Sequence, residues 1–344
     1  MKIMADKEKA LITEILTKLG LKKENAEIVA EATLDADLKG FTSHGIGRFP
    51  QYINAIKRGN INIEGKIDIE RETDAIALIN GNGIFGQVVA YKAMKLAIEK
   101  AKKIGIGAVG THDANHFGVT GFYSDLAIKE NIIGIVSANT DPAMAPLGGK
   151  IPVIGTNPIA IGIPASETYI TLDMATSISA RGKLLEAKRK GKSIPGDIAL
   201  DADGNPTTDP SKALEGSILP FGAHKGYGLA FMIEIITGPL VSAAFGSKVE
   251  GTADYKKKCT KGDFFLAIDP SKFVDINKFK EETEEFVKEI RNSGDTIVPG
   301  DLEVKEIAKN EKNGILIDEN LYEQLKEICD ELDIDIDKYL ITEQ

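Results

Sequence analysis

Residues 75–137 read AIALINGNGIFGQVVAYKAMKLAIEKAKKIGIGAVGTHDANHFGVTGFYSDLAIKENIIGIVS, and this stretch decides the fold class. Short apolar runs alternate in it with longer amphipathic segments, and glycines separate the two kinds. The expected elements are a strand at 75–79, a helix at 87–103, a strand at 106–109, a helix at 119–130 and a strand at 132–137. Alternation at this spacing indicates a parallel or mixed sheet in an α/β domain.

The flanking segments complete this organisation. Helical spacing with glycine stops fills the first sixty residues, and amphipathic helices return after residue 273. The expected helices are 6–19, 23–39, Arg48 to Gly59, 275–292, 301–310 and 318–334. The further expected strands are 158–163, 169–173 and 264–268, with a long surface excursion at 191–216. We therefore predict a helical domain from 1–70 with 295–344, and an α/β domain from 71–294.

Composition limits the classes of partner. The formal net charge of −10 argues against nucleic acid and anionic membranes, so an anionic substrate would need a local cluster of Arg or Lys. Cys259 and Cys329 have no metal-site spacing and indicate a reducing compartment. The chain opens without an export signal, which predicts a cytoplasmic protein. The absence of Trp, with plentiful Lys, Glu and Ile, points mildly to a thermophile.

One apolar stretch, Tyr227 to Phe245, is nearly long enough to span a bilayer. Glu234 lies in its middle, and Gly238-Pro239 breaks it. These residues favour a buried core helix over a membrane span.

All four histidines of the chain lie in short motifs rich in glycine and polar residues. The motifs are Thr42-Ser43-His44-Gly45, the segment Thr111–Gly118 with His112 and His116, and Gly222-Ala223-His224-Lys225-Gly226. Histidine suits proton transfer near neutral pH, and adjacent glycines allow close approach of a ligand. Loop histidines with only local hydrogen bonds are the alternative, which the placement of all four histidines in such motifs disfavours.

Gly81-Asn82-Gly83-Ile84-Phe85-Gly86 matches the dinucleotide fingerprint G-x-G-x-x-G between an expected strand and an expected helix. The amides of such a helix N-terminus could bind a pyrophosphate. The acidic residue that should close the next strand is missing, since Asp113 comes later. The residues alone leave both a phosphate loop and a tight structural turn open.

Five ordered motifs carry a resemblance to a known family. They are Ser43-His44-Gly45 with Arg48, Asn115–Gly118, Gly155–Pro158, Asp173–Ser177 and His224–Gly226. Together they resemble the malate/L-lactate dehydrogenase family of the second type, which is unrelated to the ordinary malate and lactate dehydrogenases. The likeness extends from the first helix to about residue 330.

The resemblance implies a three-layer α/β/α domain with a mixed sheet that binds the nicotinamide cofactor without a Rossmann fold. A helical domain from the N- and C-terminal segments packs beside it, and the protomers form homodimers or dimers of dimers. Of the two readings that the residues leave open for Gly81–Gly86, the resemblance implies the structural turn.

The resemblance also assigns catalytic residues. It makes His116 the proton acceptor in oxidation of a 2-hydroxy acid and the donor in the reverse direction. Arg48 is expected to hold the carboxylate through its planar fork, on one helix face with His44. Ser43 and His44 would orient the substrate or relay a proton. Where one branch of the family has an aspartate for that relay, this chain has Lys183.

The implied cofactor-binding residues lie in three segments. Thr140, Asp173, Met174, Ala175 and Lys225 match them. A helix cap would explain Asp173, and a solvated surface position would explain Lys225. Relatives that use NADP have basic residues just after a Pro-Gly-Glu turn, and Pro299-Gly300-Asp301 has no adjacent arginine. We therefore expect NAD to be preferred, with NADP as a second acceptable cofactor.

The expected substrate is a small anionic 2-hydroxy or 2-oxo acid. The chain also resembles the archaeal members of the family that act on L-sulfolactate in coenzyme M biosynthesis, so L-sulfolactate/sulfopyruvate and malate/oxaloacetate are the expected substrate pairs. Arg181 and Lys183 are candidates to hold a second anionic group. The alternatives are a zinc hydrolase, in which a helix would pair His112 with His116, and a binding protein without a cofactor. Asn115, Gly118 and the Asp at position 113 disfavour the zinc site, and no metal is expected.

Overall fold

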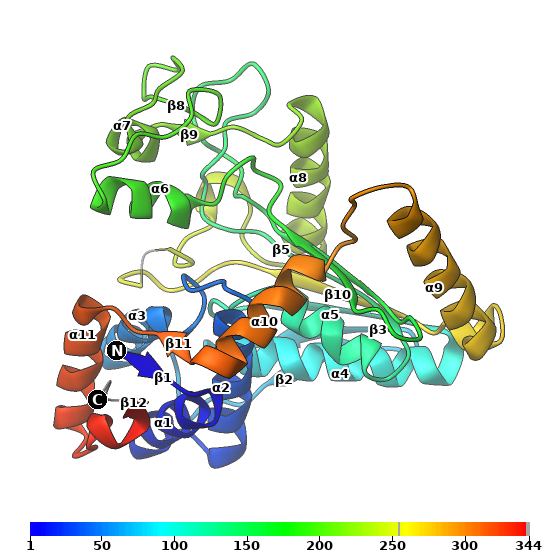
Figure 1. The fold of residues 1–344 in the computed structure, drawn as a ribbon, viewed down its shortest axis with the longest axis horizontal. Coiled ribbons are helices and arrows are strands. Elements are labelled where there is room, and N and C mark those ends of the chain that lie inside the picture. The colour runs from blue at the N-terminus through cyan, green and yellow to red at the C-terminus, as the bar shows by residue number, and fades with distance from the viewer. Residues whose placement is uncertain (254, 342–344) are drawn as a thin grey trace.

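The computed structural model describes residues 1–253 and 255–341, and a mixed sheet lies at its centre. Within these residues the sheet has the strand order β2-β3-β4-β10-β5-β6-β7 (Figure 1). Its strands are β2 (Asp68–Glu72), β3 (Ile76–Asn80), β4 (Ile106–His112), β10 (Asp263–Ile268), β5 (Ile133–Ala138), β6 (Ile159–Ile163) and β7 (Ile170–Met174). β3 and β4 are parallel and the other neighbours are antiparallel, so β3, β4, β5 and β7 all end at one edge.

Helices cover both faces of this sheet. The helices α4 (Gly86–Ile104) and α5 (Gly121–Ile128) pack on one face, and α8 (His224–Thr237) packs on the other (Figure 1). In β4 a Cβ on Gly107 would meet Ala97 of α4, whereas one on Gly110 would meet Val241 just after α8. The structure thus confirms the predicted three-layer α/β/α architecture with a mixed sheet.

Glycines in the central strands let α5 lie close to the sheet. A Cβ on Gly134 of β5 would lie 2.8 Å from Cβ of Ala127, and one on Gly162 of β6 would lie 2.9 Å from Cδ1 of Ile128. The position of α5 matters for function because the loop that precedes it contains His116.

The N- and C-terminal segments pack together beside this domain. Their helices are α1 (Ala5–Lys18), α2 (Lys23–Leu38), α3 (Phe49–Lys57), α10 (Asp301–Asn313) and α11 (Glu319–Glu331). A small antiparallel sheet in the order β11-β1-β12 joins the two ends (Figure 1). Its strands are β1 (Lys2–Ile3), β11 (Ile315–Leu316) and β12 (Leu340–Ile341), and strands of two residues carry no sequence pattern that could have predicted them.

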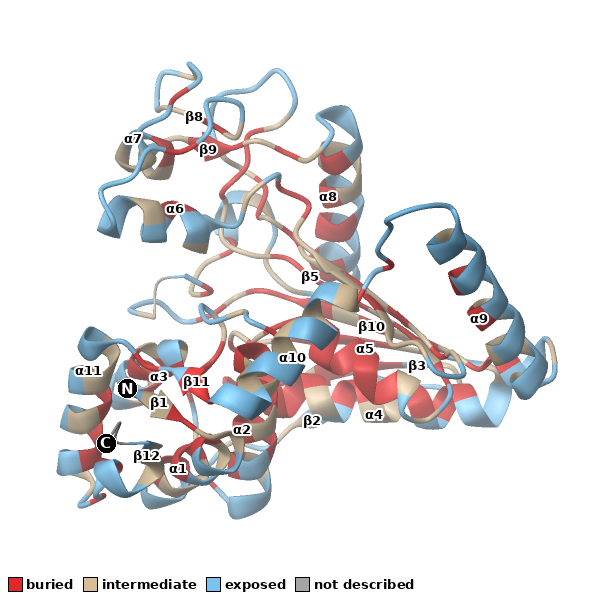
Figure 2. Cartoon of the chain, viewed as in Figure 1, coloured by how far each residue is buried: buried red, intermediate tan, exposed pale blue. Residues whose placement is uncertain are grey.

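The expected surface excursion at 191–216 is only partly correct. The segment packs with α6 (Arg181–Arg189) and contains β8 (Ala199–Leu200) and α7 (Pro210–Glu215), while β8 pairs with β9 (Ser217–Ile218). Leu184, Ile194, Ala199, Ala213 and Ile218 form a small separate core there. Figure 2 shows buried stretches at α7 and β9 among exposed loops.

The helix expected to be buried, α8, buries only one face. Phe231, Met232 and Ile235 on its other face are 44, 59 and 44% exposed. Figure 2 shows exposed and buried residues on opposite sides of this helix. Across the described residues, no helix combines the length and apolar character that crossing a membrane requires.

Candidate active site

The candidate site lies at the edge where β4, β5 and β7 end. The loop after β4 contains His116, the loop after β5 contains Thr140, and β7 ends with Asp173 and Met174. The register places the ends of β5 and β7 level with each other, since Ser137 and Met174 both pair with Ile159. Carboxyl ends of strands in α/β sheets commonly border ligand crevices.

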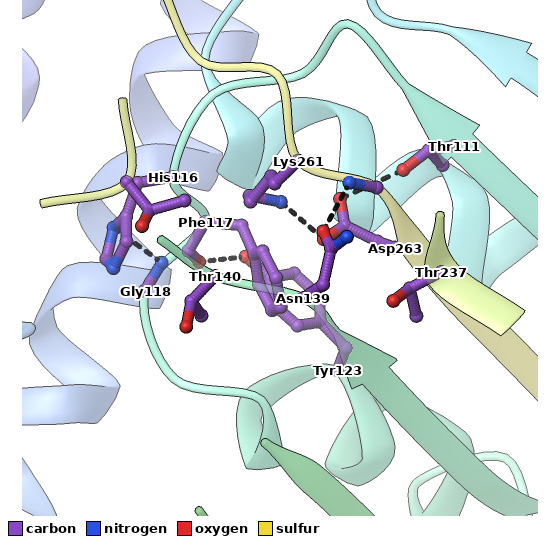
Figure 3. Close-up of polar contacts among 12 residues, drawn as sticks. Thr111, His116, Phe117, Gly118, Tyr123, Asn139, Thr140, Thr237, Lys261 and Asp263 are labelled. Atoms are coloured by element: carbon purple, nitrogen blue, oxygen red, sulfur yellow. Dashed lines mark hydrogen bonds and ion pairs between the residues drawn. The ribbon is translucent and has the colours of Figure 1, made fainter. Parts of the chain in front are cut away.

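His116 is half-buried, and α3 lies next to it. Its Nδ1 lies 2.8 Å from the hydroxyl of Tyr52, which accepts a hydrogen bond from Nε2 of Gln87 at 2.9 Å. The amide of Gly118 also points at Nδ1, at 3.3 Å (Figure 3). Because Nδ1 is occupied by protein groups, Nε2 is the ring nitrogen available to a substrate.

His44 stacks on His116, with ring centroids 5.4 Å apart. Its Nδ1 is 2.9 Å from the hydroxyl of Ser43. Burial and the charge of Arg48 lower the pKa of His44 to about 4, and the same two causes, with His44 and Lys261, lower the pKa of His116 well below its ordinary value. Both rings are therefore neutral at pH 7, the protonation state that a base requires.

Arg48 lines the same pocket as His116, but it does not lie on one helix face with His44 as expected. His44 lies in a turn, and Arg48 ends a short 3-10 helix, η1 (Ile46–Arg48), so the two do not share an α-helix face. Nη2 of Arg48 donates to the carbonyl of Thr252, and its buried Nε has no partner among the described residues. Arg48, Tyr52 and His116 line one narrow pocket.

The residues predicted to bind the cofactor lie along the same edge of the sheet. Thr140 is half-buried, and its Oγ1 accepts from the amide of Thr156 at 3.0 Å. Oδ2 of Asp173 accepts from the amide of Gly121, the first residue of α5, at 2.6 Å, so the carboxylate does cap a helix. Burial raises the pKa of Asp173 to about 7. Met174 and Ala175 are half-buried, and Lys225 is exposed in the first turn of α8.

Figure 3 shows the polar groups beneath the His116 loop. The buried Lys261 forms an ion pair with Asp263, which accepts from Thr111 at 2.9 Å. The Nζ of Lys261 lies 4.3 Å from the ring centroid of Phe117. Sequence reasoning missed this pair, which lies at the start of β10, far along the chain from His116.

The other two histidines lie elsewhere. His112 ends β4, and its ring nitrogens lie 3.1 Å from Glu70 and 3.0 Å from Asp113, while His224 is exposed at the start of α8. The helix that would have paired His112 with His116 does not form. No group of three or more His, Cys, Asp or Glu in the described part of the chain is arranged to hold a metal ion.

The Gly81–Gly86 segment is a tight turn filled by protein. The amides of Gly81 and Gly83 donate to the carbonyls of His112 and Asp113 at 2.9 and 2.7 Å. The His116 loop thus occupies the place that a pyrophosphate would need.

Arg181 and Lys183 are exposed in the first turn of α6. A Cβ on Gly182, between them, would lie 3.4 Å from Oγ of Ser43. The start of α6 therefore lies against the Ser43-His44 loop.

Comparisons with known proteins agree with this geometry. The sequence model for malate/L-lactate dehydrogenase matches residues 3–326. The malate/(S)-sulfolactate dehydrogenase of Methanothermus fervidus is 62% identical over 335 residues, which are 97% of this chain and 99% of that protein. The (2R)-3-sulfolactate dehydrogenase (NADP(+)) of Chromohalobacter salexigens is 34% identical over 267 residues, 77% of this chain and 80% of that protein.

A solved structure has the same fold over nearly the whole chain. The sulfolactate dehydrogenase from Methanocaldococcus jannaschii superposes with a TM-score of 0.94 at 52% sequence identity. The match covers 98% of this chain and 99% of the other.

Proposed function

The chain belongs to the malate/L-lactate dehydrogenase family, and from this we propose that it interconverts L-sulfolactate with sulfopyruvate, and (S)-malate with oxaloacetate, using a nicotinamide cofactor. The observation that carries the proposal is a neutral imidazole, His116, beside the guanidinium of Arg48 in one narrow pocket. A 2-hydroxy acid needs a base for its hydroxyl proton and a cation for its carboxylate. In our proposal, this step belongs to coenzyme M biosynthesis in the cytoplasm.

Each catalytic side chain has one task in this proposal. Nε2 of His116 takes the hydroxyl proton during oxidation and returns it to the keto oxygen during reduction, a step worth about 10²–10⁴ in rate. The guanidinium of Arg48 binds the carboxylate. Ser43 and His44 orient the substrate against the His116 ring.

The residues at the strand edge suit a nicotinamide cofactor. Thr140 and Asp173 present a hydroxyl and a carboxyl group, which can bond ribose and carboxamide groups, while Met174 and Ala175 add apolar contact and Lys225 an ammonium group for phosphate. Nothing lies within 4 Å of a Cβ built on Gly118, so the backbone there is open to a ligand. When bound, a nicotinamide cofactor would supply the hydride acceptor for C2 of the hydroxy acid and, in its reduced form, the hydride for the reverse direction.

We propose NAD as the preferred form of this cofactor. At the Pro299-Gly300-Asp301 turn, Nη2 of Arg291 lies 2.9 Å from Oδ1 of Asp301. The carboxylate of Asp301 therefore neutralises the guanidinium of Arg291, the positive charge that the 2′-phosphate of NADP would need. The ratio of kcat/KM for NADH and NADPH tests this, and Asp301→Ser is expected to shift it toward NADPH.

Arg181 and Lys183 are the proposed site for the second anionic group, sulfonate or carboxylate. Their support is the closeness of Gly182 to Ser43. Arg181→Ala is expected to raise KM for sulfopyruvate and oxaloacetate while leaving KM for pyruvate, which lacks that group, unchanged. Unchanged KM values for all three acids would exclude this assignment.

The experiment that tests the proposed reaction is a screen of NADH oxidation with five acceptors. Sulfopyruvate and oxaloacetate are expected to be the best substrates, ahead of pyruvate and 2-oxoglutarate. A cyclic imine carboxylate should not react, and turnover of the imine alone would overturn the proposal.

We also propose that the chain forms a homodimer through the outer face of α8 and the segment after it. That face exposes Phe231, Met232, Ile235, Ile236, Leu240 and Phe245. Contiguous exposed apolar faces of this kind mark interaction surfaces on globular proteins.

A further inference from the structure

The Gly81–Gly86 turn brings the start of α4 against the backbone of the loop that contains His116. A Cβ on Gly86 would lie 1.9 Å from the carbonyl oxygen of Asn115 and 2.6 Å from that of His116. Glycine at this position therefore allows the first turn of α4 to touch the backbone of the His116 loop. The next residue, Gln87, then reaches Tyr52.

Gln87, Tyr52 and His116 form a continuous row of hydrogen bonds. Gln87 and Tyr52 are 1 and 4% exposed, so water does not compete for them. The Gln87 amide bonds Tyr52 at 2.9 Å, and Tyr52 bonds Nδ1 of His116 at 2.8 Å. Among the described residues, the amide oxygen of Gln87 is buried without a hydrogen-bond partner. The orientation of the amide, with either its nitrogen or its oxygen toward Tyr52, therefore depends on the bond to Tyr52 alone.

The orientation of the Gln87 amide determines which ring nitrogen of neutral His116 carries the proton. If Nε2 of Gln87 donates to Tyr52, the hydroxyl proton of Tyr52 points to Nδ1 of His116, and neutral His116 must carry its proton on Nε2. That form has no lone pair to offer a substrate. If the amide is turned by half a rotation, its oxygen accepts the Tyr52 proton, Tyr52 accepts Nδ1–H, and Nε2 has a free lone pair.

We propose that Tyr52 and Gln87 are positioning residues that hold His116 in the tautomer protonated on Nδ1, with the Gln87 amide oxygen as the final acceptor. The same arrangement serves the protonated ring, since Nδ1–H still donates to Tyr52 while Nε2–H donates to a keto oxygen. Only the proton on Nε2 then changes during the reaction. The amide of Gly118, 3.3 Å from Nδ1, can donate only to a lone pair on that nitrogen. When Nδ1 carries the proton, this longer hydrogen bond is lost.

This inference rests on His116 being the proton-transferring group of the proposed function. Tyr52 bonds Nδ1 of the ring, and Tyr255 and Lys257 line the same pocket. Arg48, His44 and Lys261 disfavour a positive charge on the ring. An acceptor on Nδ1 works against them, so its removal is expected to weaken the base.

The direct test reads the tautomer by NMR on the whole protein, labelled with 15N-histidine and saturated with NADH above neutral pH. The chain has four histidines, so loss of one signal in His116→Asn assigns that ring. The wild type and Gln87→Glu, whose carboxylate can only accept, should show Nδ1–H. Gln87→Met and Tyr52→Phe should show Nε2–H. A wild-type ring protonated on Nε2, or a tautomer unchanged in Gln87→Met, would overturn the inference.

Kinetics supply the second measurement. Tyr52→Phe and Gln87→Met should lower kcat about 10- to 100-fold with little change in KM, within the range of an acid–base step. In oxidation of the hydroxy acid, Gln87→Glu should keep activity and move the acid limb of the kcat/KM profile to higher pH, since a nearby carboxylate favours imidazolium. Tyr123→Phe is the matched control, because its buried hydroxyl bonds the carbonyl of Phe117 on the same loop. It should lower Tm but keep both the tautomer and the acid limb.

The outcomes separate this inference from the proposed function. If His116→Asn remains active, the proposed function fails and the inference fails with it. If His116→Asn is inactive while the Tyr52 and Gln87 variants keep the wild-type acid limb and tautomer, only the inference fails.

Discussion

His116 is the side chain whose replacement should stop the reaction and leave the fold intact. His116→Asn removes the titratable nitrogen and keeps a polar side chain, so turnover should fall by at least about 10²–10⁴-fold. NADH binding, followed by fluorescence, should stay near that of the wild type. His112→Asn is the control, since His112 bonds Glu70 and Asp113 away from the pocket and its variant should remain active.

Arg48 should affect both substrate affinity and the ionisation of the two histidines. Arg48→Gln removes a charged hydrogen bond worth about 1.5–3 kcal/mol, so KM for the 2-oxo acid should rise about 10- to 100-fold. Arg48 lowers the pKa of His44 and His116, so in oxidation of the hydroxy acid, where His116 acts as the base, the acid limb of kcat/KM should move to higher pH in the variant.

The control for Arg48 is Arg58, which is exposed at the end of α3. Arg58→Gln should change neither KM nor the acid limb. An unchanged KM in Arg48→Gln would remove the carboxylate role from Arg48.

Single residues show clearly what the sequence could and could not predict. His44, Arg48 and His116 were found because they lie in short motifs. The structure brings Arg48 and His116 to one pocket and stacks His44 on the His116 ring. Their roles stay predictions until tested. Tyr52 lies four residues after Arg48, a helical spacing that could have found it. Gln87 gave no such signal, because only the fold brings α4 to α3.

The pairing of α1 with α2 supports the active-site loop through two buried acids. Glu8 and Asp37 are 0 and 2% exposed, and Asp37 accepts from the amide of Ile46. A Cβ on Gly45 would lie 1.9 Å from Oδ2 of Asp37, so the loop rests directly on this carboxyl group. Burial raises the pKa of Asp37 to about 7, and burial and Asp37 raise the pKa of Glu8 well above its ordinary value.

These raised pKa values predict how stability depends on pH. The folded chain keeps a proton that the unfolded chain releases above about pH 4, so stability should fall as pH rises toward about 7. Glu8→Gln removes the need for that proton. It should raise the free energy of unfolding above pH 7 by on the order of 1–3 kcal/mol and change it little near pH 4.

Urea unfolding at the two pH values measures this effect. Glu14→Gln, on the same helix, is the control and should show no such difference between the two pH values. A Glu8→Gln variant that is less stable at both pH values would show that Glu8 is held as an anion.

Whole elements were predicted where the hydrophobic period was strong. The strands and helices from β3 to β5 follow the expected order because each buries a continuous apolar pattern. The segment 191–216 was misjudged, because its Gly, Pro, Asp and Thr residues mask the few apolar positions that form its small core. The outer face of α8 was misjudged because apolar residues surround that helix, and a sequence does not show which of them a single chain covers.

At the level of the whole molecule, that outer face predicts an assembly. The wild type should run as a dimer or a dimer of dimers in size-exclusion chromatography with light scattering. Met232→Asp with Ile235→Glu should yield monomers, because two charges would be buried without partners. Phe286→Asp is the matched control, since Phe286 is 61% exposed on α9 (Ile276–Asn292) rather than on α8. A wild-type monomer, or a double variant that stays dimeric, would contradict this surface.

The overall architecture was predicted in its main layers, and the site geometry was not. Five motifs predicted the family, and with it a three-layer domain, which the structure confirms. The division at residues 70 and 295 stays a prediction. Long-range pairs such as β1 with β11, or β10 between β4 and β5, could not be predicted because nothing local in the sequence records which strands meet.

The most direct measurement is a crystal structure of the protein with NADH and a non-reactive 2-oxo acid analogue. We expect Nε2 of His116 within about 2.6–3.2 Å of the keto oxygen, with the carboxylate on Arg48 and the reduced ring facing C2. A His116 ring turned away from the nicotinamide, or bound to a metal ion, would contradict this expectation.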